Sequence, residues 1–186
     1  MNEGLIAYRY AKALLKYAQG TDATRRMYEL ARQIEKSFEA HPDLKNALLN
    51  PVLKAERKES LLLSAAGVDA DSAKEYLRFI RLLLDKRRED HIRSIMLAYQ
   101  KLYRELNHIV KASIVTATPL DKSTLARIEA VVARQCQDKI LELEHTVDPE
   151  IIGGFILDVD GLQMDASIEK ELKELRLKLI NSKTRL

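Results

Sequence analysis

The sequence has little of what marks a disulfide scaffold, a flexible linker or a membrane span. Its 186 residues include one cysteine, four prolines and six glycines. Because Cys136 is the single thiol, no disulfide can form within the chain, which favours a reducing compartment. The most apolar run, Phe79 to Leu84, is interrupted by Arg81 and is far too short to cross a bilayer. Met1 to Gly4 shows no start of a secretory signal, so we expect any link to a membrane to pass through a partner.

The residue patterns of catalytic and metal sites are also missing. Four scattered histidines lack a Cys, His or Glu at metal-ligand spacing: His41, His91, His108 and His145. Gly153–Gly154 is not followed by the Lys and Ser/Thr of a phosphate loop. Cys136 lies on an apolar helical face without a paired histidine, which is typical of a packed thiol. We therefore predict a chain that is not an enzyme and holds no cofactor or metal.

Charge is divided unevenly along the chain. Residues 1–105 carry 20 Lys and Arg against 15 Asp and Glu, a net charge of +5, whereas residues 106–186 carry 11 against 13, a net charge of −2. Neither imbalance demands nucleic acid, and the signs mostly alternate. The short basic run Lys86–Arg88 ends a predicted helix, where cations favour the helix dipole, and we interpret it as solvated charge. A basic helical adaptor that binds nucleic acid stays open as an alternative function.

Apolar side chains recur at helical spacing through the first 106 residues. Five of the predicted helices cover residues 5–19, 22–40, 43–49, 53–66 and 92–106. Another, the fifth in chain order, is capped by Asp69 or Asp71 and holds the apolar residues from Tyr76 to Leu84. Short connections between them predict an antiparallel six-helix bundle. The first and fifth helices are apolar over more of their circumference than the roughly 100° that a one-sided surface helix needs. Each is therefore either buried inside the bundle or faces the core on one side and a partner on the other.

The pattern changes near Asn107. Ile109–Ala117 is rich in β-branched residues and predicts a strand, and residues after Thr118–Leu120 predict a helix. Leu141–Val147 alternates apolar and polar residues, which predicts a strand with one solvated face. A charged helix is expected from Asp165 to about residue 180. The predicted fold class is therefore mainly α, with an N-terminal six-helix bundle over residues 1–106 and a small α+β domain over residues 107–186.

The stretch Val147–Leu157 joins two of these strands. Asp148–Pro149 should stop the first strand, because proline cannot donate to a strand ladder. Gly153–Gly154 should allow a positive φ or a close approach of the backbone to a neighbour. Asp160–Gly161 predicts a two-residue hairpin with Leu162–Met164 as its return strand, and Asp165 is the predicted N-cap of the last helix.

This block, followed by Asp160–Gly161 and then Met164–Ser167 before a charged helix, resembles the C-terminal signature of the delta subunits of F-type ATP synthases. These are the bacterial counterparts of the mitochondrial oligomycin-sensitivity-conferring protein. Residues 7–15, 79–88 and 115–120 also resemble the family, so the likeness extends along essentially the whole chain. Asp158 departs from the family, whose members often have an arginine at that position.

The resemblance implies a non-catalytic stator subunit. In the family, the N-terminal bundle holds an N-terminal helix of the alpha subunit, and the C-terminal domain meets the peripheral-stalk b subunits. The catalytic head is thereby kept from turning with the rotor, so that proton or sodium flow is coupled to ATP synthesis. A peripheral location on the cytoplasmic face of the bacterial plasma membrane is implied as well, with no nucleic acid among the partners.

Two sets of residues follow from the resemblance. Carried over by position, the alpha-subunit groove would involve Tyr10, Ala13, Leu14, Tyr17, Phe79 and Leu82. The structural motif of the C-terminal domain would consist of Asp148, Pro149, Gly153, Gly154, Gly161, Asp165 and Ser167.

Overall fold

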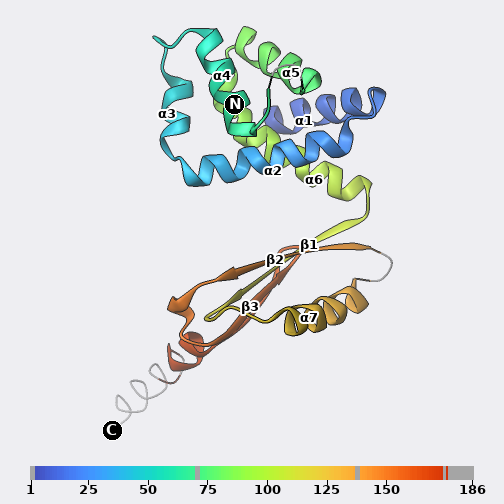
Figure 1. The fold of residues 1–186 in the computed structure, drawn as a ribbon, viewed down its shortest axis with the longest axis vertical. Coiled ribbons are helices and arrows are strands. Elements are labelled where there is room, and N and C mark those ends of the chain that lie inside the picture. Colours follow the sequence, from blue (N-terminus) through green and yellow to red (C-terminus); the bar gives the residue numbers. More distant parts are fainter. Residues whose placement is uncertain (1–2, 70–71, 137–138, 174, 176–186) are drawn as a thin grey trace. The chain divides into compact units, whose positions relative to one another are not determined.

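A computed structural model describes residues 3–69, 72–136, 139–173 and 175. They fall into two compact units, Met1–Leu106 and Asn107–Leu186 (Figure 1). The first unit is helical, and the second combines a four-stranded sheet with helices. The fold class predicted from the sequence, mainly α with a helical bundle followed by a small α+β part, is confirmed.

The described residues of the N-terminal unit form six α-helices and one short 3-10 helix. Their bounds are α1 Glu3–Gly20, α2 Thr24–Ala40, α3 Asp43–Leu49, α4 Ala55–Ala66, α5 Lys74–Asp85, η1 Glu89–His91 and α6 Ile92–Leu106. α2 starts two residues later than predicted, because Asp22 has a φ of 54°, which no right-handed helix accepts. α4 ends at Gly67, whose φ of 67° is the left-handed conformation typical of a helix C-terminus.

The core of this unit is built around α6. α1 and α2 both pack against α6, while α4 packs against α2 and α5. Tyr76 and Tyr99 are among the largest fully buried side chains, and each hydroxyl donates to a backbone carbonyl 3.1 Å away. Burial raises the pKa of both phenols. A buried ion pair of 2.6 Å between Lys58 and Glu89 joins α4 to η1. The helices are therefore held by apolar packing, with each buried hydroxyl satisfied.

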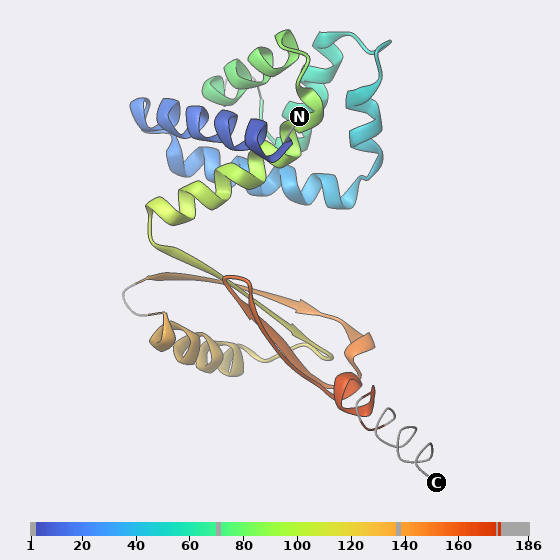
Figure 2. The same ribbon diagram turned by 180° about the vertical axis from the view of Figure 1, so that it is seen from behind.

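The C-terminal unit has the strand order β2-β1-β3-β4. The elements are β1 Ile109–Thr116, α7 Lys122–Gln135, β2 Ile140–Val147, η2 Pro149–Ile151, β3 Gly154–Val159 and β4 Leu162–Ser167, with a helix from residue 168 (Figure 2). β1 pairs in parallel with β2, through the α7 crossover, and antiparallel with β3. Alternate residues of β1 are buried: Val110, Ala112, Ile114 and Thr116. One face of the sheet therefore carries the core of the unit.

The hairpin between β3 and β4 is confirmed. Asp160 and Gly161 have φ values of 53° and 86°, as a two-residue turn with two positive φ angles requires. Asp158 accepts a hydrogen bond of 3.1 Å from the Gly161 N–H, so this carboxylate supports the turn.

The predicted end of the return strand is wrong. β4 continues past Met164 to Ser167, because it stays paired with β3 as far as Gly154. Asp165 therefore lies inside the strand and accepts from the Ser167 N–H, and the Ser167 hydroxyl is the N-cap that accepts from the Lys170 N–H. The end of the predicted helix, near residue 180, lies outside the described residues.

Backbone geometry explains the β2–β3 connection. Asp148 ends β2 and accepts from the Glu150 N–H, with Pro149 as the first residue of η2. Gly154 has a φ of 76°, and a Cβ built there would stand 2.1 Å from the Ala166 carbonyl oxygen. A Cβ at Gly153 would stand 2.6 Å from the Ile168 Cδ1, which is the end of a flexible side chain. Gly154 thus has both features that the sequence predicted, a positive φ and a close backbone neighbour.

Alanine substitutions at Gly153, Gly154 and Gly161 distinguish the cost of backbone strain from the cost of a steric clash. Gly161→Ala should cost no more than the about 1–3 kcal/mol of positive-φ strain, because open space surrounds Gly161. Gly154→Ala should cost more, since the same strain is joined by a clash with backbone that cannot move aside. Gly153→Ala should cost least, because Ile168 can rotate. The order of the three stability costs is measured by urea unfolding, monitored through the NMR amide signals of β3 and β4. Equal midpoints for Gly154→Ala and Gly161→Ala would contradict the close approach.

The N-terminus of α7 gives the C-terminal unit a pH dependence. Hydrogen bonds from the Ser123 hydroxyl and the Thr124 N–H lower the pKa of exposed Asp121 from its ordinary 3.8 to about 2. A carboxyl whose pKa is lower in the folded state stabilises that state above its unfolded pKa, and this contribution disappears as the pH falls through its folded pKa.

We therefore expect α7 to lose stability between pH values of about 3.8 and about 2. Asp121→Asn keeps an N-cap that does not titrate, so it should flatten that part of the dependence. Hydrogen exchange of the α7 amides across this range is the measurement. An identical acid profile for wild type and variant would rule out the contribution of Asp121.

Candidate functional site

A groove of about 710 Å³ lies between α1 and α5 in the N-terminal unit. Its lining residues are Ile6, Arg9, Tyr10, Ala13, Leu14, Tyr17, Arg78, Phe79, Leu82 and Arg88. All six groove positions taken from the family resemblance are among them. α1 packs mainly on α6, and α5 packs mainly on α4. Because residues of both α1 and α5 line the groove, the two helices face each other across it (Figure 2).

The two apolar stripes of α1 have different environments. The first stripe is buried in the core, with exposed fractions of 0–3%: Ala7, Ala11, Leu14 and Ala18. The second stripe lines the groove: Ile6, Tyr10, Ala13 and Tyr17. Of the two interpretations that the sequence left open for α1, the structure therefore favours a helix with one face in the core and another at an open groove.

The groove has a buried floor and an exposed rim. Leu14 and Phe79 are 2% and 6% exposed and belong to the floor. Tyr10 and Tyr17 are half-buried, whereas Leu82 on α5 is 46% exposed. Floor residues therefore serve both the bundle core and the groove, while Leu82 is open to any molecule that enters.

Three arginines at the groove were not predicted as site residues. The Arg78 guanidinium carbon lies 5.7 Å from the centre of the Tyr17 ring, and that of Arg88 lies 5.9 Å from the centre of the Tyr10 ring. Arg9 completes the set, and no acidic residue is among the lining residues. Arg88 is half-buried over a tyrosine, so the interpretation of the Lys86–Arg88 run as solvated charge is wrong for its last member. These distances are within the range of cation–π attraction.

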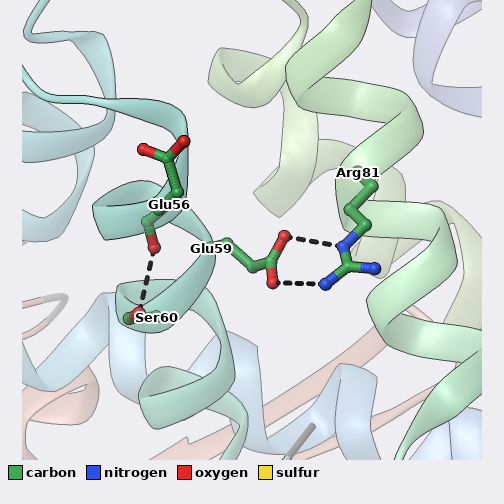
Figure 3. Close-up of polar contacts among 4 residues, drawn as sticks. All are labelled: Glu56, Glu59, Ser60 and Arg81. Carbon is green, nitrogen blue, oxygen red and sulfur yellow. Dashed lines mark hydrogen bonds and ion pairs between the residues drawn. The ribbon is translucent and has the colours of Figure 1, made fainter.

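The other arginine of α5, Arg81, has a different environment. The Arg81 guanidinium donates two hydrogen bonds to the Glu59 carboxylate of α4, with distances of 2.9 and 3.0 Å (Figure 3). Beside this pair, Ser60 donates to the Glu56 carbonyl within α4. Arg81 does not line the groove, and its charge is neutralised by the ion pair with Glu59.

A second groove, of about 460 Å³, lies in the C-terminal unit between α7 and the sheet. It is lined by Ile114, Thr124, Arg127, Ile128, Val131, Val132, Phe155, Leu157 and Met164. Val131 and Met164 are 60% and 52% exposed. None of the seven motif residues expected for this domain lines the groove. They lie in the β2–β3 connection and the β3–β4 hairpin, and so they set the course of the strands that carry Phe155, Leu157 and Met164.

Neither groove has a cluster of metal-binding side chains among its lining residues. Among the residues described by the structure, no group of three or more His, Cys, Asp or Glu side chains is placed to hold a metal ion. In the same part of the chain, no helix has both the length and the apolar character needed to span a membrane.

Comparison with known proteins identifies the family. The model of the ATP synthase delta (OSCP) subunit family matches residues 6–179. The chain belongs to the ATP synthase delta (OSCP) family. The ATP synthase subunit delta of Bacteroides thetaiotaomicron is 38% identical over 186 residues, which cover all of both chains. That of Nostoc punctiforme is 37% identical over 178 residues, 95% of each chain.

Membership of the delta (OSCP) family supports the function expected from the sequence, a stator subunit of an F-type ATP synthase. The nucleic-acid-binding alternative has no support among these relatives. The fold is also similar to a chain of the Toxoplasma gondii mitochondrial ATP synthase hexamer solved by cryo-EM, with a TM-score of 0.66 at 15% identity. That similarity covers 97% of this chain and 98% of the other.

The division into floor and rim predicts unequal effects of substitution on stability. Phe79→Ala should lower the free energy of unfolding of the bundle by about 3–5 kcal/mol, because it empties a buried aromatic site. Leu82→Ala should change it by no more than about 0.5 kcal/mol, since the side chain is already half in water. Thermal or urea unfolding followed by far-UV circular dichroism measures both. A large loss with Leu82→Ala would place that side chain in the core instead of at the rim.

Proposed function

We propose that the chain is a non-catalytic stator subunit whose two units bind different partners. The groove between α1 and α5 takes the amphipathic N-terminal helix of an alpha subunit, and the C-terminal unit takes the peripheral-stalk b subunits. The observation that carries this proposal is the second apolar stripe of α1, which faces an open groove although the first stripe is fully buried.

The dimensions of the groove support a helical ligand. From Ile6 to Tyr17 the lining residues of α1 extend over about 17 Å, or three helical turns. A helix with apolar residues at i, i+3, i+4 and i+7 presents a stripe of this length. The buried floor of Leu14 and Phe79 gives the groove a fixed shape before the ligand arrives. Binding should therefore be driven by apolar burial, with the ordering cost borne mainly by the incoming peptide.

The C-terminal unit offers a separate apolar surface. α7 covers one face of the sheet only in part, so that Phe155, Leu157 and Met164 border a groove. β4 is an edge strand, and its Leu162 is 80% exposed. Exposed apolar side chains gathered at one edge are typical of a protein-binding surface. The peripheral-stalk b subunits, whose distal end meets this domain according to the family resemblance, are the proposed partners.

This assignment makes the role of the chain mechanical. One unit binds the catalytic head and the other binds the peripheral stalk. The head is thereby kept from turning with the rotor while ions flow. The chain reaches the membrane only through its partners, and we place it on the cytoplasmic face of a bacterial plasma membrane.

Two charge-introducing variants test both contacts at once. Leu82→Asp should weaken binding of a synthetic alpha-subunit N-terminal peptide by about 2 kcal/mol or more, because it places a charge in a desolvated groove. Met164→Asp should weaken co-purification of b subunits from native membranes and leave the peptide affinity unchanged. Each variant serves as the control for the other, and calorimetric titration and pull-down of the full chain give the two measurements.

Both side chains are about half exposed, so the variants should stay folded by circular dichroism. If the wild-type chain does not bind the alpha-subunit peptide, the contact with the catalytic head proposed for this groove is wrong. If Met164→Asp retains b subunits fully, the stalk contact lies on another surface of the unit.

A further inference from the structure

Three arginines line the α1–α5 groove, and two of them, Arg78 and Arg88, lie over its tyrosine rings. Within the described residues, Arg9, Arg78 and Arg88 form no ion pair. The contrast with Arg81 is direct, because Arg81, which is on the same helix as Arg78, is held by a bidentate carboxylate (Figure 3). Among its described residues, the bundle therefore supplies an acidic partner for the arginine outside the groove and none for those that line it.

The backbone after α5 explains why Arg88 lies at the groove. Arg87 has a φ of 51°, and its N–H bonds to the Leu84 carbonyl, while the Arg88 N–H bonds to the Leu83 carbonyl. This pair of hydrogen bonds is the Schellman ending of a helix, in which glycine usually takes the position of Arg87. The next residue, Glu89, forms the buried ion pair with Lys58. Arg88 thus lies between two fixed points, and its side chain lies over Tyr10.

The two arginines that lie over tyrosine rings also have a defined spacing. Tyr10 and Tyr17 are seven residues apart on α1, which corresponds to about 10.5 Å along the helix. Arg88 lies over the first ring and Arg78 over the second. A helix lying along the groove would therefore meet one guanidinium about two turns after the other. A guanidinium that lies over an aromatic ring makes no hydrogen bond to it and keeps its N–H donors free for carboxylates.

We propose that the groove selects its helix by charge: Arg88 and Arg78 pair with carboxylates that flank the apolar stripe of the docked helix, about two turns apart. This inference rests on the proposed function, in which the occupant is an alpha-subunit helix, and it adds the chemistry by which that helix is chosen. Apolar burial supplies the affinity, and the arginines discriminate against helices with neutral or basic flanks.

The test uses the full chain and three synthetic amphipathic peptides with one apolar stripe in common. At two flanking positions seven residues apart they carry Glu, Gln or Lys. If each ion pair contributes roughly threefold, the Glu peptide should bind about tenfold more tightly than the Gln peptide. The Lys peptide should bind more weakly than both. The preference should shrink at about 1 M NaCl, where the Debye length is about 3 Å.

Substitutions locate the effect. Arg78→Gln and Arg88→Gln should each lower the affinity for the Glu peptide roughly threefold and leave that for the Gln peptide unchanged. Arg81→Gln is the matched control and should change neither affinity, because Arg81 is already paired outside the groove. Circular dichroism confirms that each variant is folded. The comparison of peptides on the wild-type chain needs no variant at all.

The outcomes separate the two proposals. Equal affinity of the wild-type chain for the Glu and Gln peptides overturns charge selection while leaving the groove as a docking site. Charge selection by these arginines is also overturned if Arg81→Gln acts like Arg78→Gln. If the wild-type chain binds neither the model peptides nor a native alpha-subunit N-terminal peptide, the proposed function of the groove fails, and charge selection fails with it.

Discussion

The N-terminal unit depends on how closely α1 can approach α6. α1 packs mainly on α6, and its buried stripe includes Ala7, Ala11 and Ala18. Small side chains on a buried helix face allow the axes of packed helices to come near. Their position on α1 also fixes the rotation of the helix about its own axis. Once the alanine stripe faces α6, the stripe with Tyr10 and Tyr17 must face α5, where no further helix of the described bundle covers it. One packing contact thus creates both the core and the groove.

The C-terminal unit has a comparable constraint in its backbone. β3 can pair with β4 as far as Ser167 only because Gly154 brings no Cβ toward the Ala166 carbonyl. That pairing places Met164 of β4 opposite Leu157 of β3, whose other edge pairs with β1. The apolar lining of the second groove therefore depends on a glycine that does not touch it. In both units, small residues outside the apolar surface of a groove position the side chains that line it.

Periodicity in the sequence was enough to predict the bundle, the α+β part and the two stripes of α1. Stripes depend on spacing along one helix, which the chain itself encodes. The family resemblance then selected six residues that share one groove. The role of Arg88 was not predictable in this way, because it follows from a left-handed Arg87 and from an ion pair between Lys58 and Glu89, 31 positions apart. The length of β4 was missed because strand ends are set by the partner strand, and Asp165 looked like an N-cap only without that partner.

The position of β1 within the sheet has a mechanical consequence. The chain leaves α6 at Leu106 and enters β1 at Ile109, and β1 is hydrogen-bonded to β2 on one edge and to β3 on the other. Tension applied through residues 107–108 enters the sheet at one end of β1. A force directed along the strand loads both of its ladders in shear, so many hydrogen bonds resist together. An edge strand such as β4, with a single neighbour, would peel away one bond at a time when pulled sideways. The chain that joins the two units thus enters the sheet at a central strand, which is held by hydrogen bonds on both edges.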